Sequence, residues 1–329
     1  MNDDGDRATR SGGGIGDRLP RRGPASRCLR WGAVAVGAGL ALGSGPVEAS
    51  ATTTPPAGAV PVVTVTSAGD AATAIDLTPV ESTGRPTRDV TTVAVIGEAS
   101  NTDGWSVHLD AEGTLVQLVE IAAANPDGSS TLTSTVESVD VTVRSGDEDA
   151  LGVLGLDLFE YLRGVPLEAD HNAQSVRTAF RVQADVSPTP EQAAIVAYWD
   201  QQGDTGTLAL PDSEVGVGAT WTITFPVSSD GIESPTRYDY ELVDVTGSSV
   251  QIDYTLTSDI TGGYDDREVG AVTAVGTISG SGAVTADLAT RAYRFTAQTH
   301  YAVTYDSATR DAIWEYDVWH ETVGTPVSA

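Results

Sequence analysis

Apolar and polar residues alternate one by one along much of the chain. The clearest run is residues 220–225, where Trp221, Ile223 and Phe225 alternate with three threonines. Successive side chains of a β-strand point to opposite faces of a sheet, so this period of two predicts a half-buried strand. The segment 210–219 before it begins with Leu-Pro and contains two glycines, which predicts a constrained turn leading into the strand.

The same alternation recurs over most of the chain beyond residue 60. We expect further strands near residues 63–66, 75–78, 105–110, 114–123, 130–143, 165–169, 176–186, 238–242, 250–256, 271–279, 283–288, 293–305 and 313–323. Clusters of glycine, asparagine, serine and aspartate predict turns at residues 111–113, 125–128, 170–173, 246–249, 280–282 and 287–291. A bulge is expected near Ser138, where the alternation slips.

Two segments have the pattern of a helix. Thr189 and Gln192 frame a Pro-Glu pair, which is a capping box with proline at the first helical position, and it predicts a helix over residues 189–202. Leu154, Leu158 and Leu162 are spaced by four, which predicts a shorter helix.

The expected fold is therefore α+β and β-rich, a strongly curved antiparallel sheet or half-barrel with one or two packed helices. We expect residues 60–329 to form a single domain in two halves, 60–186 and 204–329, which the helix at 189–202 joins.

Charge is distributed unevenly along the chain. All 18 basic residues are arginines, and seven of them precede residue 52 together with five of the 46 acidic residues. The rest of the chain carries 11 arginines against 41 acidic residues, a formal charge of −30. A body this acidic repels phosphate backbones and anionic membrane surfaces, which argues against nucleic-acid binding.

Residues 1–51 are expected to form a basic n-region and an export signal. An uncharged stretch from Trp31 to Leu42 follows the arginines and leads to small residues suited to cleavage. Export predicts a secreted or cell-envelope-associated protein, with a retained membrane anchor around Trp31–Val47 as the alternative. Residues 52–59 are a Thr/Pro-rich spacer before the domain.

The sequence contains one cysteine, Cys28, which precedes the apolar stretch of the signal. The lipidated cysteine of a lipoprotein would follow such a stretch, so Cys28 is not expected to be lipidated. Cleavage would leave a chain without cysteine, which excludes disulfides and cysteine chemistry from the expected function.

A short motif at residues 210–221 is more specific than the general pattern. It reads LPDSEVGVGATW, with Asp212, Ser213 and Glu214 in the variable positions of LPxxxVGVGATW. On this motif and the strands that follow it, the chain resembles a family of uncharacterised exported proteins and lipoproteins from high-GC Gram-positive bacteria. The resemblance spans most of residues 60–329 and implies a fold but no activity. This sequence departs from the family in having no lipobox.

No motif predicts a catalytic residue, a metal site or a cofactor. None of the histidines has a metal-like partner at i+2 or i+4; these are His108, His171, His300 and His320. Only His320 lies on the side of its strand that is expected to face inward, so we expect it alone to reach the interior. The acidic groups at 147–149 and 265–266 lack calcium-loop spacing and are expected to be solvated. No nucleophile elbow, phosphate-binding loop or dinucleotide fingerprint is present.

Aromatic residues are concentrated in the second half of the chain. Eight of the ten tyrosines and three of the six tryptophans lie beyond residue 219, most on the inward side of their strands. Such a face either packs as an ordinary core or forms a concave surface that binds an apolar ligand. The tyrosine hydroxyls need water or a polar partner in either case. The ligand-binding hypothesis assigns seven residues: Trp221, Phe225, Tyr240, Tyr254, Phe295, Tyr301 and Tyr316.

Three functions fit these patterns. The leading hypothesis is an exported non-catalytic protein that binds a lipid or another apolar small molecule on the aromatic concave face; half-barrel carriers of bacterial lipids are an analogy at the level of fold only. The alternative is a cell-envelope structural or interaction module that recognises a wall or envelope partner through its acidic surface and has no small-molecule ligand. The third is an extracellular hydrolase, which requires two carboxylates or a histidine–acid pair to meet in a cleft.

Overall fold

The computed structural model describes residues 61–77, 86–102, 104–145, 157–201, 208–229, 231–266, 270–308 and 311–327. Its elements are β1 (Thr64–Ser67), the 3-10 helix η2 (Ala71–Thr73), β2 (Thr87–Ser100), β3 (Ser106–Ala124), β4 (Ser130–Ser145), α2 (Asp157–Tyr161), β5 (Pro166–His171), β6 (Arg177–Val182), α3 (Pro190–Gln201), β7 (Thr220–Phe225), β8 (Ser228–Ser229), β9 (Ile232–Glu233), β10 (Thr236–Thr246), β11 (Ser249–Asp266), β12 (Gly270–Asp287), β13 (Tyr293–Ser307) and β14 (Asp311–Pro326).

All of these strands belong to one antiparallel sheet of 14 strands. Its order is β1-β7-β10-β11-β12-β13-β14-β2-β3-β4-β5-β6, and the short strands β8 and β9 attach beside β11. Because β14 pairs with β2, strands from the beginning and the end of the chain lie side by side in the middle of the sheet. The predicted β-rich antiparallel fold is confirmed at this level.

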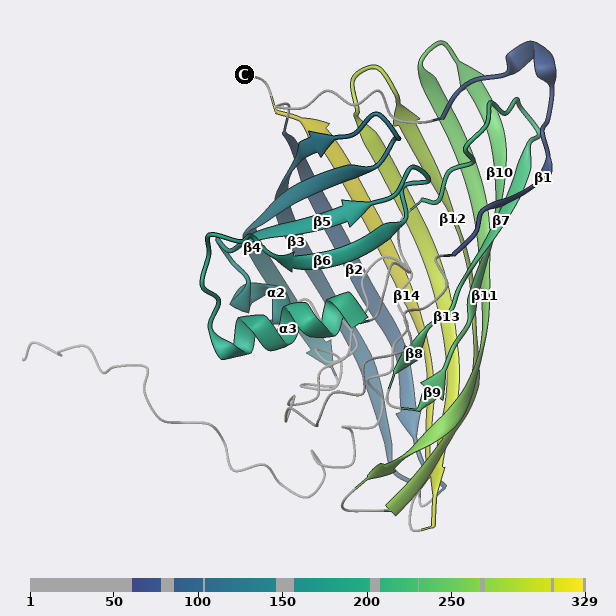
Figure 1. Cartoon of the computed structure of the whole chain (residues 1–329). Coiled ribbons are helices and arrows are strands. Elements are labelled where there is room, and N and C mark those ends of the chain that lie inside the picture. The colour runs from purple at the N-terminus through teal and green to yellow at the C-terminus, as the bar shows by residue number, and fades with distance from the viewer. Residues whose placement is uncertain are drawn as a thin grey trace, which may run out of the picture.

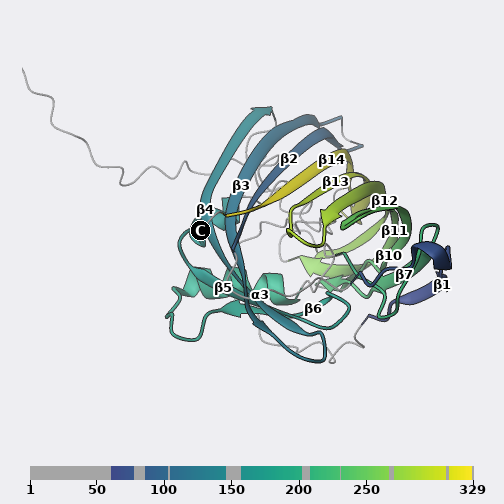
Figure 2. The same cartoon turned by 90° about the horizontal axis from the view of Figure 1, so that it is seen from above.

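The sheet is open and strongly bent. Figures 1 and 2 show the long strands curling round, with the β5–β6 hairpin and α3 on the concave side in front of the central strands. Inward-facing side chains of β2, β3, β7 and β10–β14 are buried in one continuous core on that side. Burial of apolar area there is the main source of stability, since neither helix is long enough to contribute a separate core.

Helix α3 begins as the sequence predicts. The backbone N–H of Thr189 donates to Oε1 of Gln192 at 2.9 Å, and the N–H of Gln192 donates to Oγ1 of Thr189 at 3.3 Å. This reciprocal pair satisfies two of the backbone donors that a helix start leaves unpaired. Ile195 and Trp199 on this helix are buried and pack its apolar side into the core.

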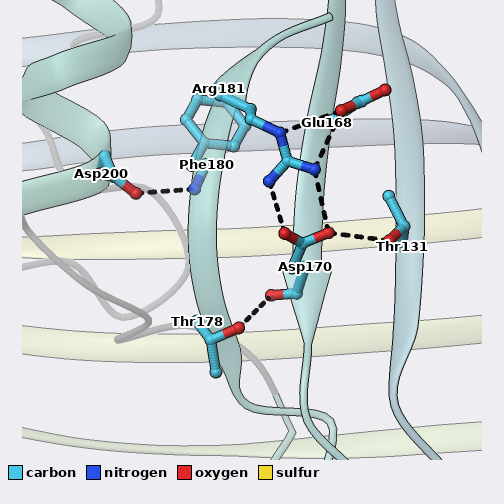
Figure 3. A network of polar contacts seen from close by, with 7 residues as sticks. All are labelled: Thr131, Glu168, Asp170, Thr178, Phe180, Arg181 and Asp200. Carbon is cyan, nitrogen blue, oxygen red and sulfur yellow. Dashed lines mark hydrogen bonds and ion pairs between the residues drawn. The ribbon is translucent and has the colours of Figure 1, made fainter. Parts of the chain in front are cut away.

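The C-terminal end of α3 covers the edge strand β6. Figure 3 shows Asp200 accepting a hydrogen bond from the backbone N–H of Phe180, at 2.7 Å, and Arg177 donates to the carbonyl oxygen of Trp199 at 2.9 Å. Next to this contact, Arg181 of β6 pairs with Asp170 and Glu168 of β5. An edge strand with unpaired N–H groups invites pairing with other chains, and these side chains reduce that exposure.

Two of the predicted turns are wrong. Residues 111–113 lie inside β3, where Ala111 pairs with Val95, and residues 280–282 lie inside β12. The glycines of β12 make room for neighbours instead of reversing the chain. The ring of Tyr254 lies over Gly282 so closely that a Cβ atom there would collide with it.

The other turns and the bulge are confirmed. The turns at 125–128, 246–249 and 287–291 join neighbouring strands of the sheet, and the register of β3 against β4 shifts between Val116 and Gln117, opposite Ser138. The expected strand at 75–78 is wrong in its described part, because Ile75 makes only an isolated bridge with Val215.

Several sequence predictions lie outside the described residues. These are the export signal with its alternative anchor at Trp31–Val47, the spacer 52–59, the acidic group 147–149 and Leu154 of the shorter predicted helix. The rest of that helix is seen as α2, which Gly164 follows with a φ of 72°. In the part of the chain that is described, no helix has both the length and the apolarity needed to cross a membrane.

Candidate functional site

Four of the seven predicted ligand-binding residues form a row of aromatic rings across the concave face. Trp221 stacks on Tyr240 with 5.4 Å between ring centroids, and Tyr240 lies 5.8 Å from Tyr254. Tyr254 then stacks on Phe295 at 5.6 Å, across the strand β12 that separates their own strands. Gly282 of β12 makes this last contact feasible, because its lack of a side chain leaves the space to the Tyr254 ring.

The remaining three predicted residues lie elsewhere in the core. Tyr301 stacks on Tyr316 at 4.7 Å between centroids, and Phe225 packs edge-on against Tyr238. Except for Phe295, all seven are at most 4% exposed, and Nε1 of Trp221 donates to the carbonyl oxygen of Ala209 at 2.8 Å. The structure therefore places six of them inside the packed core, whereas Phe295 is half-buried. Their ligand-binding role stays a prediction.

Phe295 lines a cavity of about 480 Å³ at one end of the concave side, the end marked C in Figure 1. Six consecutive strands of the bent sheet, β12-β13-β14-β2-β3-β4, form the curved wall of this cavity, and residues of the turn between β5 and β6 line it as well. A cavity of this volume falls in the range of small-molecule sites, roughly 300–1,000 Å³.

Most of the cavity wall is apolar. The apolar side chains come from β3, β4, β12 and β13 and from three loops, and they are Val119, Ile121, Leu132, Ala173, Leu208, Val284, Ala286, Leu288, Ala292 and Phe295. Since these residues come from both halves of the chain, the cavity exists only in the folded sheet. Such a wall favours the apolar body of a ligand over water.

One end of the cavity is polar and contains a buried carboxyl group. Asp89 is only 8% exposed, and its Oδ2 accepts a 2.7 Å hydrogen bond from the hydroxyl of Tyr293. Its other oxygen, Oδ1, has no hydrogen-bond partner among the described residues. Gly324 of β14 lies between the two partners in the register of the sheet, so the Tyr293 ring crosses one strand to reach Asp89.

Burial dominates the protonation of both partners. It raises the pKa of the Asp89 carboxyl above its ordinary value, against smaller opposing effects of the Tyr293 and Thr87 hydroxyls and the charge of Arg291. It also raises the pKa of the Tyr293 hydroxyl well above its ordinary value, and the nearby Asp89 adds to that rise. Tyr293 therefore stays protonated and acts as the donor of the pair.

His320 lies beside this carboxyl end and is also buried. Its Nε2 is 3.0 Å from Oγ1 of Thr322, which in turn lies 2.9 Å from Oγ1 of Thr91. Its ring contacts Phe295 with 5.2 Å between centroids. Burial lowers the pKa of His320 to about 4, so the imidazole is neutral at physiological pH. The prediction that His320 reaches the interior is confirmed. The expectation that it alone does so is wrong, because His171 also lines the cavity.

The polar end offers hydrogen-bonding groups, among them the Asp89 carboxyl, the Tyr293 hydroxyl and the His320 imidazole. Nδ1 of His320, the atom that an acid partner would hold in a catalytic pair, has no hydrogen-bond partner within the described part of the chain. An imidazole with a pKa of about 4 is also a weak base. No group of three or more histidine, cysteine or acidic residues suited to a metal ion occurs in the ranges that the structure covers.

A second hollow, of about 700 Å³, lies on the outer face of β7, β10 and β11. Its wall consists largely of outward-pointing polar side chains, with Arg237 and Asp239 paired to each other at 2.6 Å. Exposed charged groups of this kind are already solvated and give little binding energy. The smaller inner cavity, with its apolar wall and buried carboxyl group, is therefore the better candidate site.

Sequence reasoning missed the polar end of the cavity. Asp89 stands in the alternation of Thr87, Thr91 and Val93, which places it on the same inward face as these residues. The charged residue Asp89 on the inward side of its strand was the signal in the sequence that could have indicated a polar site. The partner Tyr293 lies 204 positions along the chain, so no local pattern could reveal the pair.

Comparison with known proteins identifies no family. No protein-family description matches the chain, and no curated protein matches it either. Among solved structures, OccK7 of Pseudomonas aeruginosa matches with 6% identity and a TM-score of 0.22, covering 74% of this chain and 100% of its own. A mutant of the Rhodopseudomonas blastica porin matches with 10% identity and a TM-score of 0.23, covering 72% and 100%. Scores this low carry no conclusion about function.

Proposed function

We propose that this chain is an exported, non-catalytic protein that binds an apolar small molecule, such as a lipid, in the cavity on its concave face. The observation that carries the proposal is the cavity of about 480 Å³ with an apolar wall and a buried polar end. An ordinary core would be filled at this position, because interiors pack as densely as organic crystals.

The location of the cavity supports a carrier over an enzyme. The curved open sheet has the general form of a half-barrel, and half-barrel carriers of bacterial lipids are an analogy at the level of fold only. The aromatic row from Trp221 to Phe295 ends at the cavity, so the stacked core holds one wall rigid. A wall that is already rigid loses little conformational entropy when a ligand binds, which lowers the free-energy cost of binding.

The proposal is tested by titrating the purified protein with an apolar fluorescent probe. Ala286→Phe places a ring in the cavity and is expected to abolish saturable binding. Ala271→Phe makes the same change at an exposed position of the same strand, and it is expected to bind as the wild type does. If Ala286→Phe fails to fold, Ala173→Trp at the β5–β6 turn blocks the cavity from the opposite side. Equal binding by all variants would contradict the proposal.

A further inference from the structure

Asp89 is the feature of the cavity that an apolar ligand alone does not explain. A buried carboxyl group is costly unless it is paired, and replacing it by an uncharged residue would remove that cost. The Tyr293 hydroxyl satisfies one oxygen, while Oδ1 is left without a partner among the residues described. A buried carboxyl group that lies at the polar end of a cavity and has one oxygen without a partner among the described residues is a candidate for ligand recognition.

We propose that the ligand of this cavity is an amphiphile with a protonated amine head group, which pairs with the carboxylate of Asp89 while its apolar chain lies against Leu132, Val284 and Phe295. This inference rests on the proposed function and adds the chemical class of the ligand. An ammonium group beside Asp89 donates a charge-assisted hydrogen bond to its carboxylate and neutralises the charge that burial disfavours.

Charged groups of both signs line the cavity around Asp89. Arg291 is the one cation that lines it within the described residues, and its charge acts on Asp89. Asp287 also lines it, and its carboxylate is already held by the hydroxyl of Ser248 at 2.8 Å and by the backbone N–H of Ala289. His171 and His320 complete the titratable lining together with Tyr293, and His320 is neutral.

The charge of the whole chain acts in the same direction. A net formal charge of −28 produces a negative potential that draws cations toward the protein and repels anions. A fatty acid would bring a carboxylate into the same cavity as Asp89 and Asp287, and like charges at such distances oppose binding. An alcohol could satisfy Oδ1 but would leave the charge uncompensated.

The test compares three ligands of equal chain length at neutral pH: dodecylamine, dodecanol and dodecanoate, each displacing the apolar probe. We expect the amine to bind at least roughly 10-fold more tightly than dodecanoate, as for a charge-assisted hydrogen bond. Asp89→Asn keeps the shape of the side chain and should lower amine affinity roughly 10-fold, with little effect on dodecanol. Arg291→Gln removes the competing cation and should raise the affinity for the amine.

The outcomes separate this inference from the proposed function. If all three ligands displace the probe equally and Asp89→Asn changes nothing, the cavity binds apolar molecules but the amine assignment is wrong. Tighter binding of dodecanoate than of dodecylamine overturns it as well. If none of the three displaces the probe and Ala286→Phe behaves as Ala271→Phe does, the proposed function itself fails. Circular dichroism of each variant shows whether the fold is kept.

Discussion

The hydroxyl of Tyr293 donates a 2.7 Å hydrogen bond to Oδ2 of Asp89 across an intervening strand. These residues belong to β13 and β2, and the strand between them is β14. The contact depends on Gly324, whose register position lies between the two and over which the Tyr293 ring packs. This three-strand arrangement builds the polar end of the cavity.

Gly324→Ala is therefore expected to disturb this end of the cavity. The new Cβ would collide with the Tyr293 ring, and overpacking of this kind costs about 1–3 kcal/mol in the free energy of unfolding. Urea unfolding measures this cost. In the double variant Gly324→Ala/Tyr293→Ala the collision is gone, so adding Gly324→Ala to a Tyr293→Ala protein should cost much less. If the loss of stability in the double variant equals the sum of the losses in the two single variants, the Tyr293 ring does not occupy that space.

Asp89→Asn is expected to stabilise the ligand-free protein at neutral pH. Because burial raises the pKa of Asp89, the folded protein holds this proton more tightly than the unfolded chain does. The group's contribution to stability is thus complete below its ordinary pKa of 3.8 and is lost as the pH rises through the raised folded value. The advantage of the variant should grow over that pH window in urea unfolding curves.

Asp212→Asn, which changes an exposed carboxyl group in a turn, is the control for this pH dependence. It removes the same charge from an exposed position, so the gain in stability of Asp89→Asn at neutral pH should exceed that of this control. A constant difference between Asp89→Asn and the wild type from acidic to neutral pH would contradict the buried-carboxyl account.

His320 is expected to titrate far below the ordinary value of a histidine. Its pKa is lowered to about 4 by burial, from an ordinary value of 6.5. Since the folded value is depressed, the neutral ring contributes stability above pH 6.5, and this contribution is lost as the pH falls toward about 4. NMR titration of the imidazole resonances, with His320→Gln to assign the signal, measures it. A midpoint near 6.5 would place the ring in solvent.

Trp221→Ala is expected to destabilise the whole fold. Trp221 is fully buried, and its loss leaves a core cavity next to Tyr240, for which about 3–5 kcal/mol is typical. Trp319→Ala removes the same side chain from a position that is 36% exposed and should cost much less. Thermal and urea unfolding compare them. Similar small costs for both would argue that Trp221 lines a ligand space and not a packed core.

Much of the sheet follows from alternation alone, because a half-buried strand must place every second residue in the core. The strands around Trp221, Tyr240 and Tyr301 were predictable in this way, as was the helix that Thr189 caps. The wrong turn at 280–282 shows the limit of this reasoning. A glycine that makes room for a neighbouring ring, as Gly282 does for Tyr254, looks in the sequence like a glycine that reverses the chain.

The candidate site was less accessible to sequence reasoning. The aromatic residues were correctly placed on the inward face, but only the packing of the folded sheet shows that Phe295 reaches the cavity while Trp221 does not. The polar end joins Asp89 to Tyr293 over 204 positions and Thr91 to Thr322, the neighbour of His320 on the same strand face, over 231 positions. Pairs of this kind depend on strand order and register, which the alternation of a single strand does not contain.

Native mass spectrometry of the protein purified from the organism that produces it shows whether the cavity holds a ligand. We expect a bound molecule that survives native ionisation, is released by organic solvent and is present in the wild type and in Ala271→Phe but absent from Ala286→Phe. An identical ligand-free mass for all three proteins, with no uptake of dodecylamine or dodecanol when these are offered, would contradict the proposed function.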